Sequence, residues 1–158
     1  MDSFDIRSVE SSDRGWIGRF VSEHWGASLV VVHGVTYYPE RLPGFYALRG
    51  DERVGLATYS IDGEECELVT LDSLAPGAGS ALVEVVKGAA QDNHCRRLWL
   101  VTTNDNTDAL RFYQKRGFEI VAVHKGAVAR SRKIKPEIPL IGNHGIPIRD
   151  EIELAILL

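Results

Sequence analysis

The sequence predicts an α/β (mixed α+β) fold: a central, mostly antiparallel sheet with one parallel strand pair and helices on both faces. Three observations predict it. Residues 44–73 contain three alternating segments joined by the turns RGDE and IDGE, a pattern typical of antiparallel strands. Residues 66–103 read as strand, loop, helix and strand, a unit whose two strands are normally parallel. RRLWLVTT, residues 96–103, is apolar on both faces, as expected of a strand covered on both sides.

The remaining elements follow from local patterns. DIRSVE alternates like a short strand, and SSDRGWIGRFVSEHWG offers a Ser or Asp cap, helical apolar spacing and a stop at Gly26. NDNTDALRFYQKRG predicts a helix that ends before Gly117. FEIVAV and IRDEIELAILL predict strands. Residues 26–43 contain Pro39 and Pro43 and give no clear pattern. No internal repeat or linker is apparent, so residues 1–158 are expected to form a single domain.

Composition excludes several classes of function. The chain has 158 residues, 44% hydrophobic and 25% charged, which are ordinary values for a soluble globular protein. A net charge of -4 argues against a nucleic-acid partner. No apolar run is long enough to span a membrane, and the N-terminus lacks the features of a secretory signal. No metal-binding spacing occurs, so no metal is expected. Cys66 and Cys95 fit a reducing cytoplasmic setting, with both thiols in the core.

The junction LAPGAGSALV is a candidate anion site. Four small residues, Gly77, Ala78, Gly79 and Ser80, stand where the helix begins, with almost no charge around them. The first turn of a helix carries unpaired backbone N–H groups and roughly half a positive charge. Glycines let an oxygen approach that backbone closely, so a phosphate can bind there without Lys or Arg. The alternative is a simple tight turn. A Walker loop and a dinucleotide fingerprint are excluded, because GK[ST] and a third glycine are missing.

The segment NTDALRFYQKRGF, residues 106–118, resembles the second cofactor-binding motif of the GNAT superfamily of acyl-CoA N-acyltransferases. The pattern is N-x-x-A-x-x-[FL]-Y-x-x-x-G-F. The upstream segment ELVTLDSLAPGAGSALV resembles the first motif of that family, although its loop lacks the usual Gln or Arg and is about four residues shorter. The order of elements over residues 4–123 also matches. The resemblance implies acetyl-CoA as cosubstrate, with these contacts: Leu71, Ser73, Gly77, Ala78, Gly79, Ser80, Asn106, Ala109, Phe112 and Tyr113.

The resemblance also assigns chemical roles. The helix start would hold the pyrophosphate, and the strand edge around Leu71 and Ser73 would pair with the pantetheine arm. Tyr113 is the expected acid, because a phenol with a pKa of ~10 is protonated at neutral pH and suits a departing thiolate. Phe112 would pack inward while Tyr113 faces the sulfur. The alternative for Tyr113 is a core tyrosine. Asn106 would contact the cofactor or act as a helix N-cap, or both.

The base that deprotonates the amine is expected to be Glu67, acting through water as is common in the family. By strand alternation Glu67 shares a face with Leu71 and Ser73, and Asp72 falls on the opposite face. Glu65 lies on the face of Glu67 but nearer the turn. The base is therefore Glu67, Glu65 or water.

The acceptor is a primary amine of a small molecule or a protein, and residues 26–43 and 125–148 are expected to set its identity. His33 and His144 lie in loops that would flank this site. The basic run KGAVARSRKIK is a solvated helix face, a lining for an acidic substrate, or a contact for the cofactor's ribose phosphate. The apolar last strand suggests a homodimer interface. The rival function is a non-catalytic CoA-binding sensor; a third reading is a purely structural domain.

Overall fold

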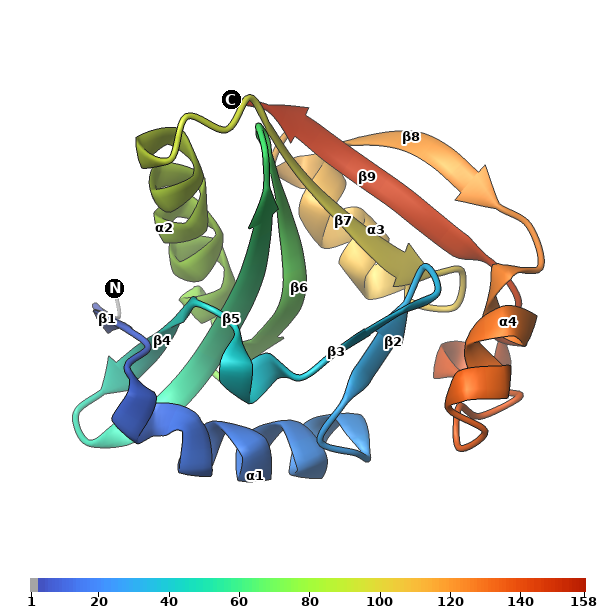
Figure 1. Ribbon diagram of the computed structural model, residues 1–158, viewed down its shortest axis with the longest axis horizontal. Coiled ribbons are helices and arrows are strands. Elements are labelled where there is room, and N and C mark those ends of the chain that lie inside the picture. Colours follow the sequence, from blue (N-terminus) through green and yellow to red (C-terminus); the bar gives the residue numbers. More distant parts are fainter. Residues whose placement is uncertain (1–2) are drawn as a thin grey trace. The chain divides into compact units, whose positions relative to one another are not determined.

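A computed structural model describes residues 3–158 and shows an α+β chain that forms two compact units (Figure 1). The first unit comprises residues 3–30 and 38–98 together with Leu158. The second comprises residues 31–37 and 99–157. Each unit combines strands with helices, as the sequence predicts.

The first unit is built on an antiparallel sheet with the strand order β1-β4-β5-β6. It confirms the meander predicted for residues 44–73. Each of the two predicted turns connects neighbouring strands, and Gly50 and Gly63 in these turns have φ values of 63° and 61°. The strands of this unit are β1 (Asp5–Ser8), β4 (Gly44–Arg49), β5 (Glu52–Asp62) and β6 (Glu65–Ser73).

Helix α2 packs on β4, β5 and β6, closely so at Gly55 of β5. A Cβ atom at Gly55 would lie 2.8 Å from Leu82 Cδ1 and 3.1 Å from the Asp72 carbonyl oxygen, so a larger residue would require Leu82 to shift. Helix α1 ends where the sequence predicts, because Gly26 takes the left-handed φ of 79°. The two cysteines are free and buried, as expected. The helices are η1 (Ser11–Asp13), α1 (Arg14–Trp25), η2 (Pro39–Arg41) and α2 (Ala78–Asp92).

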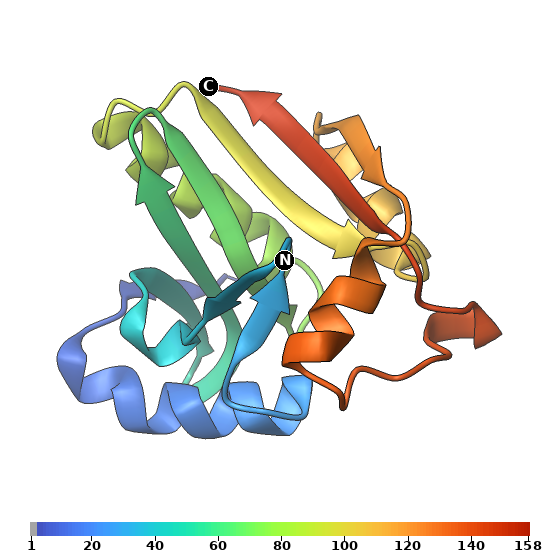
Figure 2. The same ribbon diagram turned by 45° about the vertical axis from the view of Figure 1, so that its right-hand side comes forward.

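In the second unit the last strand of the chain lies between β7 and β8 (Figure 2). β8 and β9 are antiparallel, with Glu119 opposite Ala155 and His124 opposite Glu151. The basic segment forms a short helix, α4, and β7 enters this unit at Trp99. The elements are β2 (Val30–Val32), β3 (Val35–Tyr37), β7 (Arg97–Thr103), α3 (Thr107–Lys115), β8 (Glu119–His124), α4 (Ala127–Ile134), η3 (Asn143–Gly145) and β9 (Glu151–Leu157).

Candidate active site

The glycine loop after β6 leads directly into α2, as the sequence predicts. Gly77 is the N-cap residue and has a φ of 88°, a left-handed conformation that favours glycine. Ala78 and Gly79 follow as the first helical residues, and both are buried. A left-handed glycine before the helix is compatible with both alternatives, the anion site and the tight turn.

Two N–H groups at this junction already have acceptors within the first unit. Ala78 N–H donates to the carbonyl oxygen of Ala75 at 3.1 Å, and Gly79 N–H donates to Ser73 Oγ at 3.1 Å. Ser73 Oγ in turn donates to the Ala75 carbonyl at 2.9 Å. The expectation of a bare helix end is thus not met for these two amides. An anion that takes the Gly79 N–H must displace the Ser73 hydroxyl.

Strand β6 contains a bulge at Val69. Thr58 and Tyr59 are consecutive in β5, but they pair with Thr70 and Leu68, so Val69 has no partner across the ladder. The hydroxyl oxygens of Thr58 and Thr70 lie 2.6 Å apart, which fixes both side chains on one face of the sheet. A bulge of one residue changes the face on which the following side chains lie.

The bulge corrects the predicted orientation of Glu67. Glu67 pairs with Ser60, an even-numbered residue of β5. Leu71 and Ser73 pair with odd-numbered residues of β5, whose side chains lie on the other face of the sheet. Glu67 therefore lies on the face opposite to Leu71 and Ser73, and it shares its own face with Asp72. The prediction from simple alternation was wrong on both points, because it assumed a strand without a bulge.

Three carboxylates on this face differ in their surroundings. Glu67 is buried, with 4% of its surface exposed. Glu65, the alternative base, is half exposed and forms an ion pair with Arg97 at 2.8 Å. Asp72 accepts hydrogen bonds from Trp25 Nε1 at 3.0 and 3.2 Å. Burial raises the pKa of Asp72, and the Trp25 bond opposes that rise. Asp72 is thus a perturbed carboxyl that the sequence prediction placed on the wrong face.

In the second unit, Asn106 caps helix α3. Its side-chain oxygen accepts the Ala109 N–H at 3.2 Å, and its backbone carbonyl accepts the Leu110 N–H at 3.1 Å. The N-cap alternative for Asn106 is therefore confirmed. A cofactor contact through other atoms of Asn106 stays a prediction.

Tyr113 is the buried aromatic residue of α3, with 8% of its surface exposed. Its ring packs edge-on against Phe112 and Phe118, with centroid distances of 5.1 and 5.4 Å. Phe112 is only half buried and lies beneath the guanidinium of Arg116, 3.6 Å from the ring centroid. The expectation that Phe112 packs inward was thus wrong. Ala109, four residues before Tyr113, lies on the same side of α3 and is half-buried.

The segment after α4 is fixed to the second unit by polar side chains that the sequence analysis did not single out. Asn104 accepts the backbone N–H groups of Arg149 and Asp150 at 2.9 and 3.0 Å. Asp105, 4% exposed, accepts the Asn143 N–H at 2.9 Å. Arg132 donates to three backbone carbonyls in this segment. These bonds hold residues 138–150, whose regular structure is limited to η3 and an isolated bridge between Ile141 and Pro147, so the segment has no extended periodic pattern.

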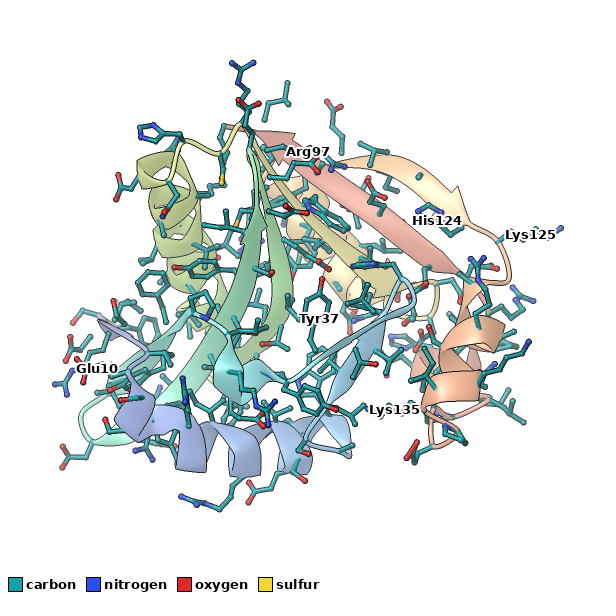
Figure 3. All side chains as sticks on the ribbon, viewed as in Figure 1. Glu10, Tyr37, Arg97, His124, Lys125 and Lys135 are labelled. Atoms are coloured by element: carbon teal, nitrogen blue, oxygen red, sulfur yellow. The ribbon has the colours of Figure 1, made fainter. Side chains whose placement is uncertain are left out.

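Two hollows of the second unit lie beside α4. One has a volume of about 460 Å³ and is lined by Lys125, Gly126, Ala129, Arg132, Arg149 and Asp150. The other has a volume of about 360 Å³ and is lined by His33, Gly34, His124, Arg130 and Glu151. Figure 3 shows His124 and Lys125 at the end of β8, where the chain turns toward α4. Both segments expected to set the acceptor, residues 26–43 and 125–148, contribute to these hollows, and His124 and residues 149–151 complete the linings.

Comparisons with known proteins agree on one family. Residues 16–118 match the model of the acetyltransferase (GNAT) family. The uncharacterized protein YdhI of Bacillus subtilis (strain 168) is 43% identical over 136 residues, covering 84% of this chain and 85% of the relative.

Two solved structures show the same fold. An IAA acetyltransferase from Bacillus cereus ATCC 14579 has a TM-score of 0.75 at 21% identity, and the match covers 99% of this chain and 100% of the other. A Bacillus subtilis acetyltransferase in complex with CoA has a TM-score of 0.72 at 21% identity, with 99% of each chain covered. The α+β fold described above is therefore the fold of these acetyltransferases.

Over residues 3–158, no group of three His, Cys, Asp or Glu side chains is placed to hold a metal ion. Across the same residues, none of the helices is both long enough and apolar enough to cross a bilayer.

Proposed function

Because the chain belongs to the acetyltransferase (GNAT) family, we propose that it is an N-acetyltransferase. It transfers an acetyl group from acetyl-CoA to a primary amine of a small molecule or protein, by direct attack in a ternary complex. The observation that carries this proposal is the family match over residues 16–118. The solved acetyltransferase in complex with CoA supports the choice of cosubstrate.

In the proposed reaction the amine gives up two protons and the sulfur takes up one. The amine first loses a proton, and its nitrogen then attacks the thioester carbonyl carbon. The C–N bond forms and the C–S bond breaks, the amide nitrogen releases a second proton, and the departing thiolate takes up one. Holding both reactants together contributes roughly 7 kcal/mol or more to such a step, so the chain needs few catalytic groups.

For CoA binding, the proposal assigns the pyrophosphate to the backbone of Gly77, Ala78, Gly79 and Ser80. The left-handed Gly77 has no side chain to shield the main chain, and binding of the anion would displace the Ser73 hydroxyl from the Gly79 N–H. The edge of β6 around Leu71 and Ser73 is assigned to pantetheine. The remaining proposed contacts come from α3 and its cap: Asn106, Ala109, Phe112 and Tyr113.

For the proton transfers, we assign the acid to Tyr113 and the base to Glu67, acting through water. The hydroxyl of Tyr113 matches the family motif by position. Glu67 is preferred over Glu65 because it stands six residues before the end of β6, where the family often places a glutamate, whereas Glu65 lies nearer the turn.

The test is a thiol-release assay on the purified protein with acetyl-CoA and a panel of amines, run beside a thermal-shift measurement with CoA. Amine-dependent thiol release supports the enzyme. Protection by CoA without turnover on any amine supports the rival, a CoA-binding sensor. Neither protection nor turnover contradicts both functions and leaves a structural domain.

A further inference from the structure

The hollow of about 360 Å³ in the second unit, here called the Glu151 pocket, contains a buried carboxylate. It is lined by His33, Gly34, His124, Arg130 and Glu151. Its volume lies in the range of small-molecule sites. Glu151 is 4% exposed, although carboxylates are rarely buried to this extent without a cationic partner.

The backbone of the β2–β3 turn holds the Glu151 carboxylate in place. His33 and Gly34 have φ values of 42° and 78°, as in a two-residue hairpin turn. This turn lets the backbone N–H of His33 donate to Glu151 Oε2 at 2.9 Å. One neutral donor offsets only part of the desolvation of a carboxylate. Within residues 3–158, Glu151 makes no ion pair, so its negative charge is left for a cation from outside the chain.

Arg130 supplies the opposite charge in the same pocket. It is exposed on α4, and no carboxylate in the described part of the chain pairs with it. A guanidinium binds a carboxylate through two parallel N–H···O bonds. The neighbouring pair of His124 and Glu153, 3.3 Å apart, does not involve Arg130. The pocket therefore presents one buried anion and one accessible cation.

We propose that the Glu151 pocket binds a small molecule that carries both a primary ammonium and a carboxylate. The ammonium binds Glu151 and the carboxylate binds Arg130. The pocket's role as the site of the acetyl acceptor rests on the proposed function, because it requires that this ammonium lose its proton and accept the acetyl group. Binding itself does not depend on that function.

The binding test uses the full chain and calorimetry with matched probes. Glycine, β-alanine and γ-aminobutyrate are each compared with the alkylamine and the carboxylic acid of the same carbon number. The amino acid that binds best should bind at least about tenfold tighter than either analogue, because each analogue loses one charge-assisted contact. Equal binding of the amino acid and the alkylamine, or no measurable binding of any probe, would overturn the proposal.

Two variants assign the contacts. Arg130→Gln should remove the preference for the amino acid over the alkylamine. Because Arg130 is exposed, we expect this substitution to leave folding intact. Glu151→Gln should weaken every amine at least about tenfold, while its amide oxygen can still accept the His33 N–H. Lys133→Gln, an exposed cation of α4 outside the pocket, is the matched control. If R130Q and K133Q lower binding equally, the carboxylate contact is wrong.

Thiol release then separates the two proposals. Amino acids that bind in this pattern but release no thiol from acetyl-CoA leave the pocket assignment standing and overturn acetyl transfer to its ligand. Turnover on other amines that R130Q and E151Q do not change supports the acetyltransferase and overturns the pocket as its acceptor site.

Discussion

Gly142 passes against the buried carboxylate of Asp105 with no room for a side chain. A Cβ atom at Gly142 would lie 2.1 Å from Asp105 Oδ2 and 2.7 Å from Ile148 Cγ1. The neighbouring N–H of Asn143 donates to the same Asp105 oxygen at 2.9 Å. The φ of Gly142 is -110°, which any residue can adopt, so the close approach rather than the backbone conformation requires glycine.

Gly142→Ala should therefore destabilise the protein by about 1–3 kcal/mol, the usual cost of overpacking. Urea unfolding measures this change. Gly88→Ala is the matched control: nothing lies within 4 Å of its added Cβ, and it sits inside α2. That control should stabilise by about 0.5–1 kcal/mol. Equal effects of the two substitutions would show that the Asp105 contact does not limit residue 142.

Tyr113→Phe tests the proposed acid. It should lower thiol release at saturating amine by about 10²-fold, the lower end of what general acid–base catalysis contributes. CoA affinity, measured by calorimetry, should stay unchanged because phenylalanine preserves the ring contacts with Phe112 and Phe118. Tyr38→Phe, an exposed tyrosine, is the control. Full activity of the Y113F variant would show that Tyr113 is not the acid.

Local patterns predicted most elements because each has a signal within a few residues. The meander of β4, β5 and β6 follows from its two turns, and the ends of α1 and α3 follow from Gly26 and Gly117, both with positive φ. These signals depend on glycine's freedom to adopt left-handed conformations and need no tertiary information.

The orientation of Glu67 could not be predicted in this way. The bulge at Val69 depends on how β6 pairs with β5, and VTL has no sequence feature that distinguishes a bulged strand from a regular one. Alternation therefore assigns the wrong face to every residue beyond the bulge. The pairing of Thr58 with Thr70 exists only because of the bulge: a regular hairpin counted from Asp62 and Glu65 would place Thr58 opposite Val69.

The Glu151 pocket could not be predicted from the sequence either: the segments 26–43 and 125–148 include His33, Gly34 and Arg130, but not His124 or Glu151. His33 and Glu151 are far apart in the chain, and their contact is made by a backbone N–H rather than a side chain. Only the fold brings a turn and a strand end together in this way. The basic run at α4 was visible as charge, but the sequence could not show which of its cations lines a pocket.

Ser73→Ala tests the start of α2. The substitution removes the hydroxyl that accepts the Gly79 N–H and donates to Ala75, so urea unfolding should show a loss of about 1 kcal/mol. CoA should bind this variant at least as tightly as the parent, because the Gly79 N–H no longer has to leave the hydroxyl. Ser22→Ala on α1 is the control. Weaker CoA binding to S73A would argue against the proposed pyrophosphate contact.

Cys66 should resist modification in the folded protein. Burial, together with nearby Cys95 and Glu67, raises the pKa of its thiol to about 12. The reactive thiolate is therefore scarce at neutral pH, and the sulfur is also shielded from reagent. In a Cys95→Ala background, the rate at which a thiol reagent such as dithionitrobenzoate labels Cys66 in urea should equal the rate of unfolding of the chain in the same urea concentration. Rapid stoichiometric labelling in native buffer would contradict this account.

Asp72 should make stability fall as pH rises through the acid range. Burial raises its pKa in the folded state above the ordinary 3.8, despite the opposing effects of the Trp25 bond and of His24. The folded state therefore binds more protons than the unfolded state just above pH 3.8, and stability falls with rising pH until the folded-state pKa is passed. At neutral pH the protein retains this destabilisation.

Asp72→Asn should consequently be more stable than the parent at neutral pH, because its neutral amide oxygen can still accept the Trp25 N–H. The difference should shrink as pH falls below 3.8, where Asp72 is protonated in both states. Urea unfolding across this range measures it, with Asp51→Asn in the exposed β4–β5 turn as control. A D72N variant that is less stable than the parent at neutral pH would mean that the charged Asp72–Trp25 bond outweighs the desolvation of the carboxylate.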